Sequence, residues 1–392
     1  MNIVRRAAVL AILTASFVAC SNEPADPASP TCTPSTPSST DAFARAHAPD
    51  SPEIALARAI ADRWLAVHPP EKAAWDWGDG VQLGALMELH RVTGEPRYRD
   101  HVKRFLDAQI AAGYEIVTSD RCPPVLSALA LYGQTCDAKY RKVVDDMQRY
   151  LEVDALRTDD GGINHFGTVR VFGASLWIDS LYMFGQVLIR RGEAWNDAPA
   201  LDLYGSQYRV FAKHLQDAAT GFFVHAYHWS GQDPNVFWAR GNGWVVASAA
   251  DYLRVRAARG ESDAEVRTSF LRLVQAVVAA QDPKTGLFWT VLNRPGETYL
   301  ETSATALFAL GLARARRAGV LDATALDPVN RAMDGVRSRI VNDSAGRPVV
   351  TGISGPTTAG SFKRYAAVPL EDDVHYGVGA VILALIEVAG LT

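Results

Sequence analysis

The stretch GWVVASAADYLRVRAAR, residues 243–259, is followed after a short turn by AEVRTSFLRLVQAVVAAQ, residues 264–281. The first segment carries small and apolar residues on nearly every side of a helix, as expected of a helix that is buried all round. The second carries apolar residues at helical intervals among charged ones, which is typical of a helix with one exposed face. This pair predicts a helical hairpin with one buried and one half-exposed member.

The same pairing recurs along the whole chain, and the strand signal is weak throughout. Amphipathic helices are expected at 53–67, 96–112, 137–153, 203–217, 264–281 and 327–341, and apolar helices at 82–93, 123–132, 174–190, 243–259, 303–318 and 377–389. Repeated helical hairpins stack into open or closed arrays. An open solenoid is the alternative, but its inner helices would not be so uniformly apolar. We therefore predict an all-α fold, an (α/α)6 barrel with six inner helices inside six outer ones.

The loops that precede the inner helices resemble one another. The segment Asp217–His225 recurs in form at Asp282–Trp289, in each case between an outer helix and the next inner one. All such loops should emerge at the end of the barrel where the inner helices begin. The polar and aromatic residues expected at that rim are Trp75, Trp77, Asp79, Asp120, His165, Trp177, Asp179, His225, Trp238, Arg240, Trp244, Glu301, Lys363 and His375. Their concentration predicts a ligand pocket at this end.

The amino terminus has the pattern of an export signal. Arg5 and Arg6 precede an apolar stretch that is too short to span a bilayer comfortably. Val18-Ala19-Cys20 then resembles a bacterial lipobox, with Cys20 as the lipidated residue; an ordinary secretory signal is the alternative. We expect a signal peptide at 1–20, a Pro-, Ser- and Thr-rich tether at 21–50 and a single catalytic domain at 51–392. The protein is then exported and touches the membrane through its lipid anchor only.

Charge and cysteine content exclude several classes of partner. The chain carries 39 basic and 43 acidic side chains, a net charge of −4, and no basic stripe that would indicate nucleic-acid binding. Cys122 and Cys136 flank a helical stretch of about 20 Å, estimated from the rise per residue, which is too long for a disulfide. No Cys/His cluster has metal-ligand spacing, so neither a metal nor another cofactor is expected.

Two motifs indicate chemistry at the rim. The run LWIDSLYM, residues 176–183, places Asp179 among apolar residues, and burial favours the protonated form of a carboxyl group. Asp179 is therefore a candidate proton donor. The run FWARGNGW, residues 237–244, places Arg240 between two indoles, an arrangement that suits a sugar ring carrying a carboxylate. A buried salt bridge between Asp179 and Arg240 is the alternative interpretation.

Together with TGFFVHA at 220–226 and YLETS at 299–303, these motifs resemble the unsaturated rhamnogalacturonyl hydrolases of glycoside hydrolase family 105. That family is related to the unsaturated glucuronyl hydrolases of family 88. The resemblance implies an (α/α)6 barrel, Asp179 as the catalytic acid/base and Asp120 as a second essential carboxylate. It also implies a substrate site, to which we assign His165, Trp177, His225, Trp238, Arg240, Trp244, Trp77 and Lys363. Phe166 stands where some relatives have an acidic residue.

The implied reaction is hydration of a 4,5-unsaturated uronic acid at the non-reducing end of an oligosaccharide, which releases the neighbouring sugar. The acid needs a raised pKa, and we expect nearby indoles and Asp120 to raise that of Asp179. Arg240 or Lys363 is expected to face the substrate carboxylate. A sugar epimerase that uses His165, His225 or His375, and a non-catalytic glycan-binding lipoprotein, are the competing interpretations.

Overall fold

The computed structural model describes residue 32, residues 49–171 and residues 173–391. The expectations for the signal peptide, for Cys20 and for almost all of the tether lie outside these residues. The described residues from 49 onward belong to one compact unit, to which the description below is confined. In the described part of the chain, no helix combines the length and the apolar composition needed to cross a bilayer.

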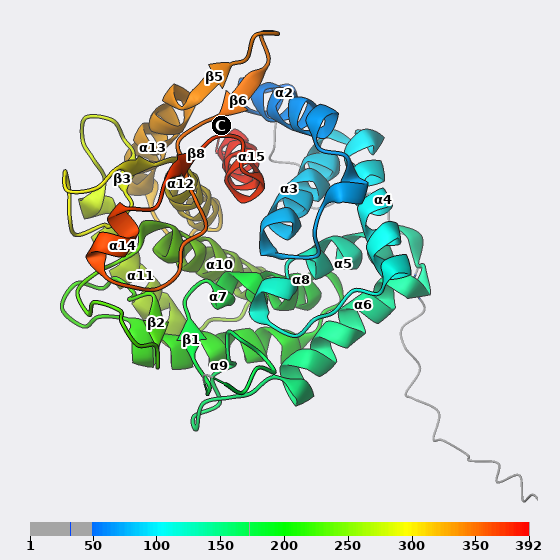
Figure 1. Cartoon of the computed structure of the whole chain (residues 1–392), viewed down its shortest axis with the longest axis horizontal. Helices are drawn as coiled ribbons and strands as arrows, with labels where there is room; N and C mark the ends of the chain where they lie inside the picture. The colour runs from blue at the N-terminus through cyan, green and yellow to red at the C-terminus, as the bar shows by residue number, and fades with distance from the viewer. Residues whose placement is uncertain (1–31, 33–48, 172, 392) are drawn as a thin grey trace, which may run out of the picture. The chain divides into compact units, whose positions relative to one another are not determined.

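The described residues form two concentric rings of helices (Figure 1). The outer helices are α2 (Pro52–Val67), α4 (Pro96–Ala112), α6 (Ala138–Arg149), α9 (Ala198–Leu215), α11 (Ala264–Ala280) and α13 (Leu326–Ser338). The inner helices are α3 (Trp77–Thr93), α5 (Pro124–Thr135), α7 (Ser180–Met183) with α8 (Gly185–Ala194), α10 (Ala239–Ala258), α12 (Thr302–Arg317) and α15 (His375–Ala389). Neighbouring inner helices pack in the order α3, α5, α8, α10, α12, α15, and α15 packs on α3 to close the ring. The predicted (α/α)6 barrel is confirmed.

Local sequence explains where these helices begin. Ser51 caps α2 by accepting from the backbone N–H of Ile54, and Pro52 follows in the first turn, where its missing N–H costs nothing. Asp263 caps α11 in the same way, by accepting from the N–H of Val266. The inner helices are apolar on all sides because both faces are covered: every residue of α15 from Tyr376 to Ala389 is buried.

The segment 174–190 differs from the single apolar helix that the sequence predicts. Leu176–Trp177 forms strand β1, which pairs with β2 (Ala226–Tyr227), and the helix begins only at Ser180. The backbone N–H of Ile178 continues this pairing by donating to the carbonyl of His225, which lies far away in the sequence. A helix prediction based on local periodicity misses such a long-range pair. The correction matters because the strand and the hydrogen bond of Ile178 hold the next residue, Asp179, at the mouth of the barrel.

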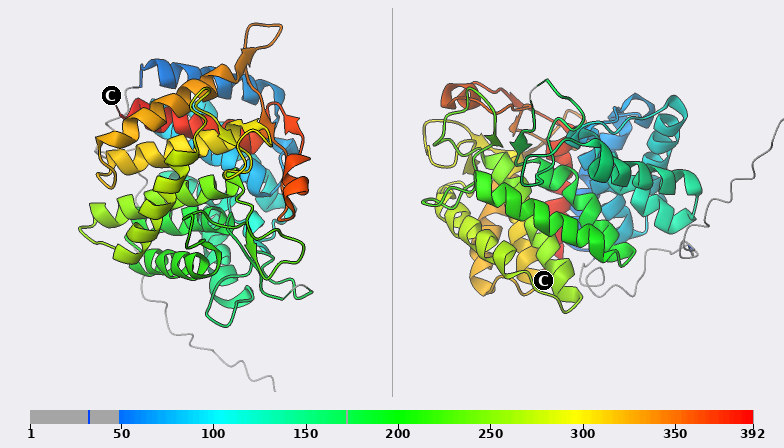
Figure 2. Two further views of the ribbon diagram at one scale, coloured as in Figure 1. Left: turned by 90° about the vertical axis from the view of Figure 1, so that its left-hand side faces the viewer. Right: turned by 90° about the horizontal axis from the view of Figure 1, so that it is seen from below.

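The remaining elements are short and lie in the connections. They are η1 (Pro70–Lys72), η2 (Ser119–Arg121), a π-helical turn η3 (Tyr150–Asp154) that ends α6 earlier than predicted, η4 (Ala323–Ala325), α14 (Phe362–Ala366), and three hairpins, β3 (Phe288–Trp289) with β4 (Leu300–Glu301), β5 (Ile340–Asn342) with β6 (Pro348–Val350), and β7 (Ile353–Ser354) with β8 (Leu370–Glu371). Figure 2 shows such loops and hairpins gathered at one end of the barrel.

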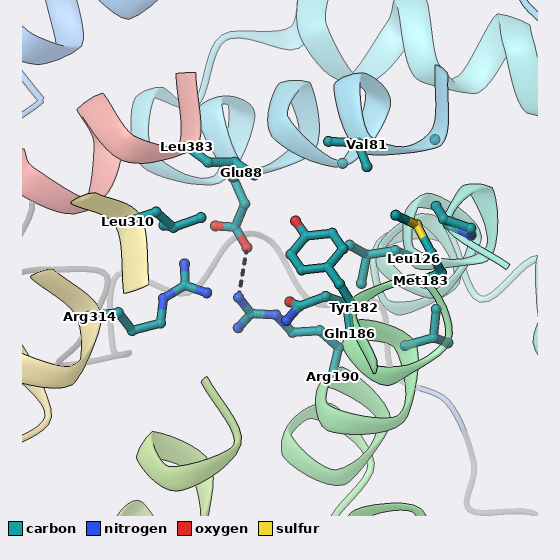
Figure 3. A pocket seen from close by; sticks show the side chains of 14 residues that line it. Val81, Glu88, Leu126, Tyr182, Met183, Gln186, Arg190, Leu310, Arg314 and Leu383 are labelled. Atoms are coloured by element: carbon teal, nitrogen blue, oxygen red, sulfur yellow. Dashed lines mark ion pairs between the residues drawn. The ribbon is translucent and has the colours of Figure 1, made fainter. Parts of the chain in front are cut away.

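The carboxyl-terminal halves of the inner helices enclose a buried cluster of ion pairs. Glu88 faces Arg190 at 3.5 Å beside a cavity of about 20 Å³ (Figure 3). Asp251, which is fully buried, lies 3.3 Å from Arg190 and 3.4 Å from Arg314. Arg314 pairs in turn with Glu387 of the last helix at 2.9 Å. These contacts link helices α3, α8, α10, α12 and α15 across the barrel interior.

Candidate active site

The amino-terminal ends of the inner helices meet at the opposite end of the barrel and carry most of the predicted site residues. Asp179 is the N-cap of α7, Trp238 is the N-cap of α10, and Glu301 is the N-cap of α12. Asp120 lies in η2 directly before α5, and His375 is the first residue of α15. We refer to the region between these helix starts as the cup.

His165 lies between the two predicted catalytic carboxyl groups. Its Nε2 is 3.8 Å from Oδ2 of Asp120, and its Nδ1 is 3.9 Å from Oδ1 of Asp179. Nδ1 also lies 3.0 Å from Oγ of Ser180, and the ring stacks on the indole of Trp177 with centroids 4.8 Å apart. The structure therefore brings Asp120 and Asp179 together around one imidazole.

Asp179 has the environment expected of a carboxylic acid that holds its proton. Burial, countered in part by His165 and reinforced by the charge of Asp120, raises the pKa of Asp179 to about 6. Its Oδ1 is buried and has no hydrogen-bond partner among the described residues. The nearby His165 and the backbone N–H groups of Asp179 and Ser180 compensate an anion there only in part, so the neutral acid is favoured up to mildly acidic pH.

Aromatic rings form the wall of the cup beside these groups. Trp177 meets the edge of His225 with centroids 4.9 Å apart, and His225 stacks on Trp238 at 4.3 Å. Two half-buried rings, Phe166 and Trp229, lie 5.4 and 5.0 Å from Trp177. Trp177, His225 and Trp238 are themselves almost fully covered, so the half-buried Phe166 and Trp229 offer the accessible aromatic surface on which the apolar face of a pyranose can stack.

Arg240 is buried and holds a loop in place. Its guanidinium donates to the carbonyls of Ser354 and Gly355 at 2.7 and 2.9 Å and lies between the rings of Trp238 and Tyr376. Among the described residues no ion pair joins Arg240 to Asp179, so the alternative of a salt bridge between them is wrong. A further N–H donates to Oγ1 of Thr357 at 3.2 Å, and the carboxylate of Glu301 lies 4.0 Å away, so groups of the protein itself already match most of the donors and the charge of Arg240.

The other three predicted binding residues occupy different depths. Trp77 is half-buried at the start of α3 and stacks on Tyr376 with centroids 4.4 Å apart. Lys363 is exposed on α14. Trp244 is only 1% exposed and packs on Tyr182 in the hydrophobic core below the cup. The assignment of Trp244 to the substrate surface is therefore corrected: it supports the helix that follows Asp179.

One group of possible metal ligands arises from contacts that the sequence spacing did not reveal. Donor atoms of Asp76, Asp79 and His375 all lie within 4.8 Å of one another. The two carboxylates already accept backbone N–H groups at the start of α3, and Nδ1 of His375 faces the N–H of Tyr376. These contacts account for the three side chains as capping groups, and the expectation of a metal-free site remains a prediction. Cys122 is a free, buried thiol, so it forms no bridge with Cys136.

With this geometry in place, comparison with known proteins decides the family. The sequence profile of Glycosyl Hydrolase Family 88 matches residues 56–392. The chain belongs to glycosyl hydrolase family 88. It is therefore a glycoside hydrolase, and the predicted relationship to families 88 and 105 is confirmed.

Individual relatives agree with this family 88 membership. The chain is 28% identical to the unsaturated rhamnogalacturonyl hydrolase YesR of Bacillus subtilis over 246 residues, which cover 61% of this chain and 70% of that protein. A possible family 105 member from Salmonella enterica superposes with a TM-score of 0.77 at 23% identity over 86% of this chain and 93% of that one. The unsaturated glucuronyl hydrolase of Bacillus sp. GL1 superposes with a TM-score of 0.66 at 19% identity over 86% and 96%. These two likenesses concern the fold.

Proposed function

We propose that this family 88 hydrolase removes a 4,5-unsaturated uronic acid from the non-reducing end of oligosaccharides produced by polysaccharide lyases. The observation that carries the proposal is the carboxyl group of Asp179, which is only 13% exposed and whose pKa is raised to about 6 beside a second carboxyl group. The aromatic wall next to it supports a sugar ligand, and the similarity to an unsaturated rhamnogalacturonyl hydrolase supports this substrate class.

The proposed reaction adds one water molecule across an enol ether. Asp179 transfers its proton to C4 of the unsaturated ring, and positive charge develops at C5 and the ring oxygen. The oxygen of a water molecule bonds to C5 while Asp179, now a carboxylate, takes a proton from that water. The hemiketal at C5 then opens, and the neighbouring sugar leaves. The acid is regenerated within the cycle, so one carboxyl group serves as both acid and base.

The neighbours of Asp179 divide the supporting tasks. Asp120 disfavours ionisation of Asp179 through its own charge and stabilises the positive charge that develops on the sugar. His165 contacts both carboxyl groups and orients them. Trp177 removes water from one side of the site, which strengthens these electrostatic effects.

A panel of lyase-generated unsaturated oligosaccharides tests the proposal. The enzyme should abolish the ultraviolet absorbance of the conjugated double bond and release the next sugar, while Asp179→Asn should fold and leave the absorbance unchanged. An epimerase would retain the absorbance while changing the sugar configuration, and a glycan-binding protein would change neither. Persistent absorbance with every member of the panel would refute the proposal.

We also propose that the chain is exported and anchored through a lipid on Cys20, because the preceding residues resemble a lipobox. Expression in a bacterial host with a radiolabelled fatty acid tests this. The wild-type protein should carry the label and fractionate with membranes, whereas Cys20→Ser should do neither. Equal labelling of both proteins would contradict the proposal.

A further inference from the structure

The imidazole of His225 is held tightly, yet only one of its nitrogens has a partner among the described residues. Nδ1 lies 2.8 Å from Oη of Tyr365, a buried residue of α14. Nε2 is buried and has no hydrogen-bond partner there. The ring cannot turn freely because it stacks on Trp238 and meets the face of Trp177. Its role therefore depends on which nitrogen carries a proton.

The surroundings of His225 favour its neutral form. Burial, together with the positive charges of His165 and Arg240, holds its pKa well below the usual range. A neutral imidazole carries a single N–H, on either Nδ1 or Nε2. The hydrogen bonds of Tyr365, the partner of Nδ1, decide between these two tautomers.

Tyr365 receives a hydrogen bond from a second direction. The backbone N–H of Gly360 donates to Oη of Tyr365 at 3.4 Å. If Tyr365 donates its own proton to Nδ1 of His225, Nε2–H of His225 is the one group between Gly360 and His225 that lacks a partner among the described residues. If Nδ1 instead carried the proton, Tyr365 would accept two N–H groups, and its own O–H would have no acceptor among the described residues. The second arrangement also leaves Nε2 as a buried acceptor without a donor, so it has two unpaired groups where the first has one, and the first is preferred.

We infer that Tyr365 is a positioning residue that fixes His225 as the tautomer with its proton on Nε2, so that this N–H donates to an acceptor oxygen of the bound uronate. The inference rests on the proposed function for the identity of the ligand. The tautomer itself is a property of the free enzyme. Tyr365 contributes no atom to the reaction; it determines that His225 acts as a donor rather than an acceptor.

Nitrogen-15 NMR of the histidine side chains tests the inference in the free protein. The signals of His225 are assigned by their loss in His225→Gln. In the wild type they should show a protonated Nε2 and an unprotonated Nδ1 that accepts a hydrogen bond. In Tyr365→Phe, which keeps the ring but removes the hydroxyl, the two tautomers should mix. A protonated Nδ1 in the wild type, or an unchanged tautomer in Tyr365→Phe, would overturn the inference.

Kinetics provide the second measurement, with a matched control. Tyr365→Phe should lower kcat/KM about 5- to 10-fold through a higher KM, the loss expected for one weakened hydrogen bond to a charged group. Its pH profile should stay unchanged. Tyr208→Phe removes a comparable buried hydroxyl, bonded to Ser269 in the outer ring, and should alter neither tautomer nor kinetics. A protein with the expected tautomer that hydrates no unsaturated substrate would refute the proposed function and leave the tautomer assignment standing.

Discussion

Replacing Asp179 by asparagine should abolish turnover and, at neutral pH, make the folded protein more stable. The pKa of Asp179 is about 6 in the folded state, against 3.8 for the unperturbed group. Above pH 6 the folded protein must hold a buried carboxylate, one of whose oxygens has no hydrogen-bond partner among the described residues. At 1.36 kcal/mol per pKa unit, this ionisation costs about 3 kcal/mol of stability. Asparagine keeps the shape without the charge and avoids that cost.

The direction of the pH dependence follows from the raised pKa. Below pH 3.8 Asp179 is protonated in both the folded and the unfolded chain, so it imposes no ionisation cost. Between pH 4 and 6 the unfolded chain ionises first, and the wild type loses stability as the pH rises. Above 6 both states are ionised and the loss is constant. The advantage of Asp179→Asn should therefore be small near pH 3.5, grow up to pH 6 and level off.

Urea unfolding at pH 3.5, 5 and 7 measures this advantage. The exposed Asp159→Asn is the control and should show no such growth with pH. A stability difference between wild type and Asp179→Asn that does not change between pH 3.5 and 7 would refute the assignment of a raised pKa. If Asp179→Asn were less stable than the wild type at pH 7, the residues of the cup would stabilise the carboxylate of Asp179 rather than disfavour it.

Three further predictions concern the pH profile and the scaffold. The value of kcat/KM should decline above a pKa near 6, and Asp120→Asn should shift this pKa to lower pH, because the charge of Asp120 raises the pKa of Asp179. An unchanged pKa in Asp120→Asn would show that Asp120 does not influence the ionisation of Asp179. Asp251→Ala should lower the free energy of unfolding by about 3–5 kcal/mol in urea titrations, because it removes a fully buried carboxylate that Arg190 and Arg314 share and leaves their positive charges less compensated; a loss below 1 kcal/mol would contradict this. Gly286→Ala should cost more than about 2 kcal/mol by the same assay, because φ is +73° and the new Cβ would lie 2.0 Å from the carbonyl oxygen of Arg331; a neutral effect would show that the loop relaxes.

The barrel could be predicted from the sequence because its signal is local and repeated. Most inner helices carry small and apolar residues on nearly every side, as in α15, and each outer helix has a regular apolar face, as in 264–281. The start of α7 could not be predicted in this way. Strand β1 exists because Leu176 pairs with Tyr227 across the fold, and local periodicity carries no information about such a partner.

The sequence predicted which residues lie in the candidate site better than it predicted what each of them does there. Asp179 stood out as a charge in an apolar segment, and the structure gives it the expected raised pKa. Arg240 stood out for the same reason, but the backbone carbonyls it binds belong to a loop more than 100 residues further along the chain. The sequence pattern did not indicate Tyr365 as a site residue, because a helix of five residues is too short for its periodicity to show which side chains face inward.

The closure of the ring by α15 imposes an order on how the enzyme matures. The last helix of the chain packs on α3, among the first, and on α12, and it also contributes Glu387 to the interior ion pairs. Until residues 375–389 have been synthesised, the apolar sides of α3 and α12 lack their partner and Arg314 lacks the carboxylate of Glu387. A nascent or truncated polypeptide would therefore expose apolar surface of α3 and α12, which chaperones and proteases can bind. Activity should appear all at once when the final helix docks, rather than growing as the polypeptide lengthens.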